Sequence, residues 1–174
     1  MKRTILVIGL VIALAGGAFA YGGGGFFQGS YIAIPDYTNI DRGAEVVGGY
    51  GYGTDRDGAR HGGFGLAIHD SDNDELLGGF GGIISGSQLR TGPLTVSLNL
   101  WSGIGFVNPE LVRTRSAFGY FIEADAEAGF AILPWFQVSV YAGMQAIGSF
   151  EPASIISSAR YTPVVGSRFT WGGF

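Results

Sequence analysis

Residues 135–147, WFQVSVYAGMQAI, alternate between two kinds of side chain. Successive side chains of a β-strand point to opposite faces, so this period of two predicts a strand with one apolar and one polar face. The stretch is long enough to cross a membrane as a strand. The apolar positions are Phe136, Val138, Val140, Ala142, Met144 and Ala146, and the others are Gln137, Ser139, Tyr141, Gly143 and Gln145.

Two further stretches, 94–106 and 118–130, repeat the alternation. In the first, Leu94, Val96 and Leu98 share a face, opposite Thr95, Ser97 and Asn99. The second has an apolar face that runs from Phe118 to Phe130. Its other face consists of Gly119, Phe121, Glu123, Asp125, Glu127 and Gly129.

Weaker strands can be identified elsewhere, which brings the expected number to eight. Turn-rich links separate them, and an even number of strands with tight links is typical of an up-and-down barrel. Ten strands result if one link itself forms a hairpin. The weaker strands are 25–34, 44–53, 62–68, 76–85 and 160–174. The links are 35–43, 54–60, 69–75, 86–92, 107–115, 133–134 and 148–158.

The first twenty residues have the three parts of a secretory signal peptide. Lys2 and Arg3 are basic, residues 4–17 are almost wholly apolar, and Ala18-Phe19-Ala20 is a cleavage signature. The alternative is a single anchoring helix, but the apolar run of about 14 residues is shorter than the ~20 a spanning helix needs. We therefore expect a signal peptide at 1–20, a barrel at 21–174 and export to the outer membrane.

Composition narrows the function of residues 21–174. They keep 10 − 2 = 8 basic residues and all 14 acidic ones, a formal charge of 8 − 14 = −6, which excludes the basic face of a nucleic-acid-binding protein. Hydrophobic residues make up 47% of the chain without a helix-length apolar run in this part, as alternation produces. The 32 glycines disfavour helix, and the many aromatic residues argue against disorder.

A soluble β-sandwich would also alternate, but its outer face would carry many charges. The apolar faces of the three best strands are continuous. They therefore favour an all-β, eight-stranded, antiparallel, up-and-down transmembrane β-barrel, with lipid outside and a polar interior. In such barrels both termini are periplasmic, so links 35–43, 69–75, 107–115 and 148–158 are expected to be external.

The chain's last residues, RFTWGGF at 168–174, carry a resemblance. Together with the strand pattern, they make residues 21–174 similar to the small outer-membrane barrels of the OmpA-like and OmpX-like kind. The resemblance implies that Phe174, Trp171 and Phe169 form the signal read by the outer-membrane assembly machinery. Trp171 and Phe169 differ in parity from Phe174, and a bulge near Gly172-Gly173 would restore the phase.

The interior is expected to hold an ionic network. Glu123, Asp125 and Glu127 share a face because their spacing is two. Buried carboxylates need partners, and Arg168 and Arg160 share a parity on the last strand. Glu45 and His61 are also assigned to this network. The plain interpretation is a set of ion pairs that fills a narrow barrel; the alternative is an ion path or a catalytic carboxylate.

Other candidate sites are weaker. Acidic residues in the 69–75 link imitate the start of an EF-hand, but Glu75 and Gly81 occupy positions that need Gly and Glu, so only weak cation binding is expected. A lipid hydrolase would need Ser and His together on the lipid face. Both His61 and His69 are assigned to the interior, opposite Phe64, Leu66 and Ile68. The acidic link residues are Asp70, Asp72, Asp74 and Glu75.

Aromatic residues near strand ends are predicted to form interfacial girdles. They are Phe26, Phe27, Tyr31, Tyr50, Tyr52, Trp135, Phe150, Tyr161 and Trp171.

No motif indicates an enzyme or a cofactor. The predicted function is a structural or surface-interaction role in the outer membrane, with lipid and the assembly machinery as partners. A narrow channel for small solutes or ions is the alternative, and a membrane-embedded hydrolase comes third.

Overall fold

The computed structural model describes residues 22–32, 42–70, 76–108, 118–150 and 160–172, and the side chains of 22–32, 42–43 and 160 lie outside this description. The predicted signal peptide, the external links and Phe174 therefore lie outside the described residues, apart from the link ends. Among the described residues, no helix is long and apolar enough to cross a bilayer.

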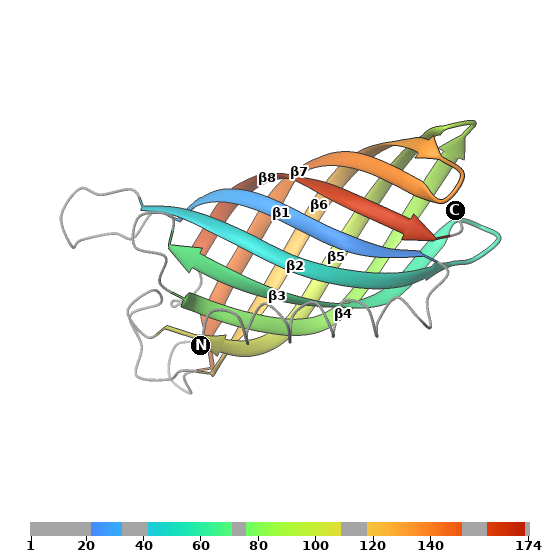
Figure 1. Cartoon of the computed structure of the whole chain (residues 1–174). Helices are drawn as coiled ribbons and strands as arrows, with labels where there is room; N and C mark the ends of the chain where they lie inside the picture. Colours follow the sequence, from blue (N-terminus) through green and yellow to red (C-terminus); the bar gives the residue numbers. More distant parts are fainter. Residues whose placement is uncertain (1–21, 33–41, 71–75, 109–117, 151–159, 173–174) are drawn as a thin grey trace.

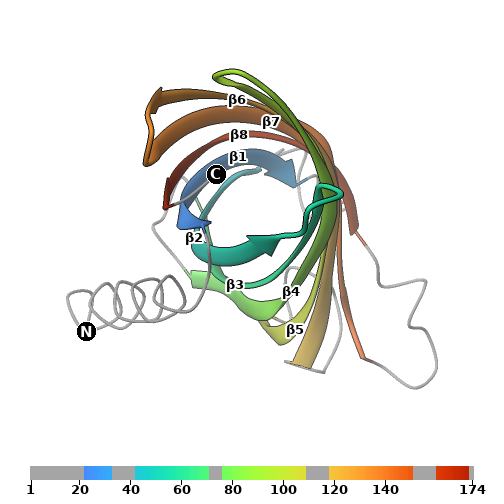
Figure 2. The same ribbon diagram turned by 90° about the vertical axis from the view of Figure 1, so that its right-hand side faces the viewer.

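The described chain is all β, and each strand runs antiparallel to the next. The strands are β1 (Gly22–Ile32), β2 (Arg42–Thr54), β3 (Ala59–Asp70), β4 (Leu76–Thr91), β5 (Leu94–Val107), β6 (Phe118–Leu133), β7 (Phe136–Ser149) and β8 (Arg160–Gly172). Pairing of β1 with β8 closes the sheet into a barrel, as the end-on view shows (Figure 2). The predicted all-β, antiparallel, up-and-down arrangement is confirmed.

The strands are strongly tilted. Following paired residues once around the barrel from Leu94 of β5 returns to Ile104 of the same strand, a stagger of 104 − 94 = 10 residues. With this stagger the strands tilt by roughly 40° and enclose a space that side chains just fill. The three short hairpin turns and the end of β8 lie at one end of the barrel (Figure 1). The intermediate pairs are Phe130, Val138, Phe169, Gly25, Gly49, Gly65 and Gly81.

Strands β5, β6 and β7 present the faces that alternation predicts. On β6, Glu123, Asp125 and Glu127 are buried inside, and Ile122 is exposed outside. On β5, Leu98 and the other large aliphatic residues also point outward. The alternation of the sequence therefore separates interior from exterior correctly on this half of the wall.

On β2 and β3 the faces are the reverse of those expected. Phe64, Leu66 and Ile68 are buried inside, whereas His61 is exposed. The physical reason is volume: Gly63, Gly65 and Ala67, on the other parity, are too small to fill the barrel. Tyr50 and Tyr52, predicted to lie in a girdle, are likewise buried inside, at 3% exposure each.

Candidate functional site

Three carboxylates from β6 converge on one point inside the barrel. Glu123, Asp125 and Glu127 are spaced by two residues, and their side chains are almost completely buried. A buried charge without a partner costs several kcal/mol, so this row requires cations and hydrogen-bond donors opposite it.

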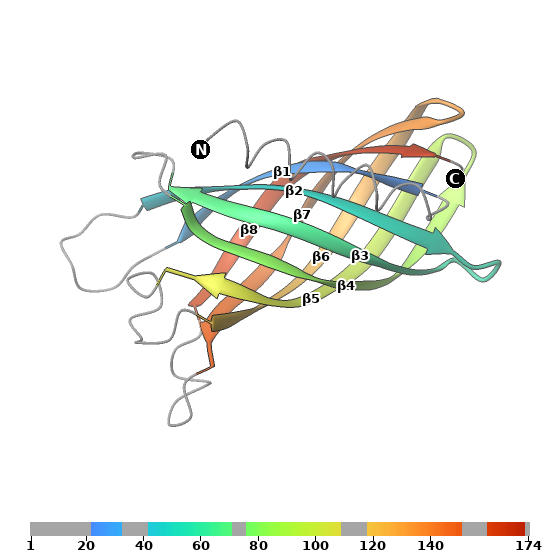
Figure 3. The same cartoon turned by 60° about the horizontal axis from the view of Figure 1, so that its bottom comes forward.

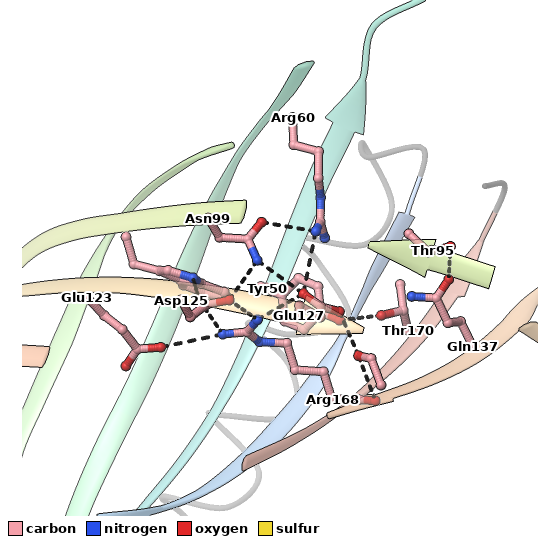
Figure 4. Close-up of polar contacts among 12 residues, drawn as sticks. Tyr50, Arg60, Thr95, Asn99, Glu123, Asp125, Glu127, Gln137, Arg168 and Thr170 are labelled. Carbon is pink, nitrogen blue, oxygen red and sulfur yellow. Dashed lines mark hydrogen bonds and ion pairs between the residues drawn. The ribbon is translucent and has the colours of Figure 1, made fainter. Parts of the chain in front are cut away.

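Arg168 of β8 supplies the central cation, and it is 1% exposed. Its Nη1 lies 2.9 Å from Asp125 Oδ1 and 2.8 Å from Glu127 Oε2 (Figure 4). Its Nη2 lies 2.8 Å from Asp125 Oδ2 and 3.4 Å from Glu123 Oε1. One planar guanidinium thus binds Asp125 through two parallel hydrogen bonds and holds the other two carboxylates at its sides.

Neutral donors complete the coordination of Asp125. Asn99 Nδ2 donates to Asp125 Oδ1 at 2.8 Å, and Trp101 Nε1 donates to Oδ2 at 2.7 Å. With Arg168, each carboxylate oxygen of Asp125 accepts two hydrogen bonds. Glu127 is satisfied in a similar way, since Ser139 Oγ donates to its Oε1 at 2.6 Å and Asn99 donates to its Oε2 at 3.2 Å.

A second buried guanidinium, Arg60 at the start of β3, joins the same cluster. Its Nη1 donates to Asn99 Oδ1 at 3.0 Å and lies 3.5 Å from Glu127 Oε2. Its guanidinium carbon lies 3.8 Å from the centre of the Tyr52 ring. Arg60 thus approaches the cluster from the wall opposite β6 and β7.

Aromatic rings enclose the cations. The guanidinium carbon of Arg168 lies 3.6 Å from the Tyr141 ring centre and 4.6 Å from that of Trp101. Cation–π attraction is strongest where water is excluded, so these rings stabilise Arg168 while filling space around it. Tyr50 hydrogen-bonds to Thr170 beside the cluster.

The rest of the interior is apolar. Trp101 packs edge-on against Phe64 with ring centres 5.2 Å apart, and Phe64 is 5.7 Å from Phe121. Phe121 is in turn 5.7 Å from Phe80. These rings join buried aliphatic residues such as Ile84 and Val107 in one core cluster. The described interior therefore combines a satisfied ionic cluster with a packed aromatic core.

The structure brings together only part of the predicted network. Glu123, Asp125, Glu127 and Arg168 meet, but Glu45 and His61 are exposed on the outer face, so their assignment to the interior was wrong. Both errors follow from the reversed faces of β2 and β3. Arg160 begins β8 opposite Ile147, and its side chain lies outside the described residues.

The reversed face also removes the reason for excluding a Ser–His pair on the outside. His61 is paired across the strands with Ser85 of β4, and both side chains point outward. No hydrogen bond joins the two in the described structure, and no carboxylate lies on the neighbouring outward positions Gly53, Gly63 and Ser87. The third group that orients a catalytic histidine is thus missing from this pair.

Sequence reasoning missed several members of the cluster. Arg60 was assigned to a link, but β3 begins at Ala59 and turns Arg60 inward. Trp101 and Tyr141 were on the correct inward parity, and an indole or phenol facing a row of acids was the available signal. The register between Arg60 and Glu127, by contrast, depends on barrel closure.

Two other predicted sites remain largely outside the described residues. Of the acidic link only Asp70 is described; it ends β3 and is 1% exposed. No cluster of three potential metal ligands occurs in the described part of the chain. Of the assembly signal, Phe169 and Trp171 are exposed, and Gly172 has a positive φ of 133° that favours glycine.

The network predicts an order of stability effects. Asp125→Asn is expected to lower the free energy of unfolding by about 1.5–3 kcal/mol, because an amide cannot accept both guanidinium bonds. Glu123→Gln should cost less, since its contact with Arg168 is longer, at 3.4 Å. Urea unfolding in detergent micelles checks the order, and equal midpoints for Asp125→Asn and the native chain would contradict it.

Comparison of the chain with protein-family models, with curated proteins and with solved structures finds no significant match. The geometry of the barrel is therefore the basis for assigning its function.

Proposed function

We propose that this chain spans a bacterial outer membrane as a small closed barrel and has a structural or surface-interaction role. The observation that carries the proposal is the outer surface of β5–β8, where two aromatic bands flank an aliphatic one. At the hairpin end the exposed aromatic residues are Phe130, Trp135, Phe169 and Trp171. At the other end they are Phe106, Phe118, Phe150 and Tyr161, and between the bands lie Leu98, Leu100, Ile122, Val140, Met144 and Val165.

The separation of the bands fits a bilayer. Phe118 and Phe130 stand on the same strand, 130 − 118 = 12 residues apart. At about 3.3 Å per residue and a tilt near 40°, this is roughly 30 Å along the barrel axis. Membrane barrels have an apolar band about 25 Å tall between aromatic girdles. In water, the same surface would expose far more contiguous apolar area than a soluble monomer usually does.

The filled interior supports a structural role over transport. Eight strands leave no more space than side chains occupy, and here that space holds paired ions and stacked rings. A path for solutes would have to pass the Phe64–Phe121–Phe80 contacts. The role therefore resides in the barrel as a membrane element and in the loops it carries, which fits membrane integrity, surface contact or adhesion.

The test uses the chain produced from its full-length gene in a Gram-negative host. It should fractionate with outer membranes, and the unheated protein should migrate differently from the boiled protein on a gel, as folded membrane barrels do. Once reconstituted in planar bilayers, it should give no stable conductance steps. Recovery as a water-soluble monomer without detergent would overturn the proposal, and regular conductance steps would replace the structural role with that of a channel.

A further inference from the structure

The outer surface of β2, β3 and β4 differs from the rest of the barrel. Every exposed charged or histidine side chain of the described residues lies on these strands or in the β2–β3 turn, and the outer surfaces of β5–β8 carry none. Figure 3 shows these strands side by side on the near wall. The exposed residues are Glu45, Asp55, Arg56, Asp57, His61 and Arg90.

Glycine occupies the centre of this surface. Outward positions on β2, β3 and β4 carry no side chain over three adjacent strands. We call this region the glycine face, defined by Gly49, Gly51, Gly53, Gly63, Gly65 and Gly81.

The barrel's own packing does not demand these glycines. A Cβ at Gly81 would meet only the Phe64 carbonyl oxygen at 3.6 Å, an ordinary contact, and one at Gly53 would meet nothing within 4 Å. The inward Gly82 is different, since a Cβ there would lie 2.0 Å from the Ser102 oxygen. Curvature therefore accounts for the interior glycine but leaves the outer face unexplained.

Ionisable residues border the glycine face. Glu45 is paired across the strands with His69 at one end, and His61 is paired with Gly53 at the other. Ionisable side chains directed at lipid are costly and rare. Together with the missing aliphatic side chains, they indicate that protein rather than lipid covers this wall.

We infer that the glycine face packs against the same face of a second copy of this chain, an inference that rests on the proposed membrane span. In a two-fold dimer whose axis runs parallel to the barrel axis between β2 and β3, β2 of one copy lies against β3 of the other. Glu45 then faces the partner's His69, and the same contact repeats by symmetry. A carboxylate accepts a hydrogen bond from an imidazole N–H, so the patch is complementary to itself.

Glycine is what such a contact requires. Inside a membrane, association depends on van der Waals packing and interchain hydrogen bonds, and small residues let backbones approach closely. Cα–H groups of one sheet can then contact carbonyl oxygens of the other. A large side chain on the face would hold the two barrels apart.

The experiment measures energy transfer between donor- and acceptor-labelled copies in phosphatidylcholine vesicles. The chain has no cysteine, so Thr91→Cys in the exposed β4–β5 turn gives a single labelling site. Transfer should exceed that of randomly distributed barrels and fall when unlabelled protein is added. Gly81→Leu should weaken association by about tenfold or more, and Ala126→Leu on the opposite wall should not change it.

Charge exchange is the second arm. Glu45→Arg should reduce transfer, and the paired exchange of Glu45→His with His69→Glu should restore it. Barrels that enter the vesicles but show only random transfer overturn the dimer while leaving the proposed function intact. Excess transfer that Gly81→Leu and Glu45→Arg both leave unchanged, with folding checked by gel mobility, places the contact elsewhere and also overturns the inference. Failure to enter vesicles at all would instead refute the membrane span.

Discussion

Replacing Arg168 with methionine is expected to lower the free energy of unfolding by about 3–5 kcal/mol, because it leaves buried carboxylates without their central cation. Arg168 makes four of the contacts that hold Glu123, Asp125 and Glu127, and it is 1% exposed. Methionine matches much of its length but offers no donor. The remaining donors to this row are mostly neutral, and Arg60 reaches only Glu127, at 3.5 Å.

Two further variants separate charge from geometry. Arg168→Lys keeps the positive charge but replaces a planar fork by a point charge, so it should recover only part of the loss. Arg90→Met removes an exposed arginine whose Nε donates to the Gly92 oxygen at 3.0 Å, and it should change stability by less than about 0.5 kcal/mol. The three are compared by reversible urea unfolding in micelles. Equal losses for Arg168→Met and Arg90→Met would show that the cluster contributes little.

The half of the barrel that alternation describes well is the half where both faces have clear chemistry. On β6, three acids at a spacing of two could only point away from Ile122 and Ala124 into a place that holds cations. Arg168 was predicted from its parity on the last strand. Local pattern sufficed here because lipid-compatible and charged side chains differ so strongly in the free energy of burial.

The other half could not be predicted from a local pattern. On β3, Phe64 and Leu66 alternate with Gly63 and Gly65, and either face could be the outer one. The choice depends on which side chains must fill the space left by β5–β8, a property of the closed barrel that one strand does not contain. Arg60 was missed for the same reason, since its role follows from the start and register of β3.

Introducing arginine at Leu100 is expected to destabilise the barrel by about 2–4 kcal/mol in a bilayer, the cost of a cation near the membrane midplane. Leu100 is 49% exposed on the outer face of β5, six residues from both Leu94 and Phe106. It therefore lies halfway between the two aromatic bands. A side chain that faced water would tolerate the same change at little cost.

The matched control is Tyr161→Arg in the band far from the hairpins, where Tyr161 is 68% exposed. Arginine there can reach the headgroups, so the expected loss is only about 0–1 kcal/mol. Urea unfolding of both variants in phosphatidylcholine vesicles measures the difference. A water-exposed surface would make the two substitutions equivalent, whereas a hydrocarbon layer makes the cost depend on depth. A loss at Leu100 no greater than that at Tyr161 would therefore remove the physical basis for a membrane span.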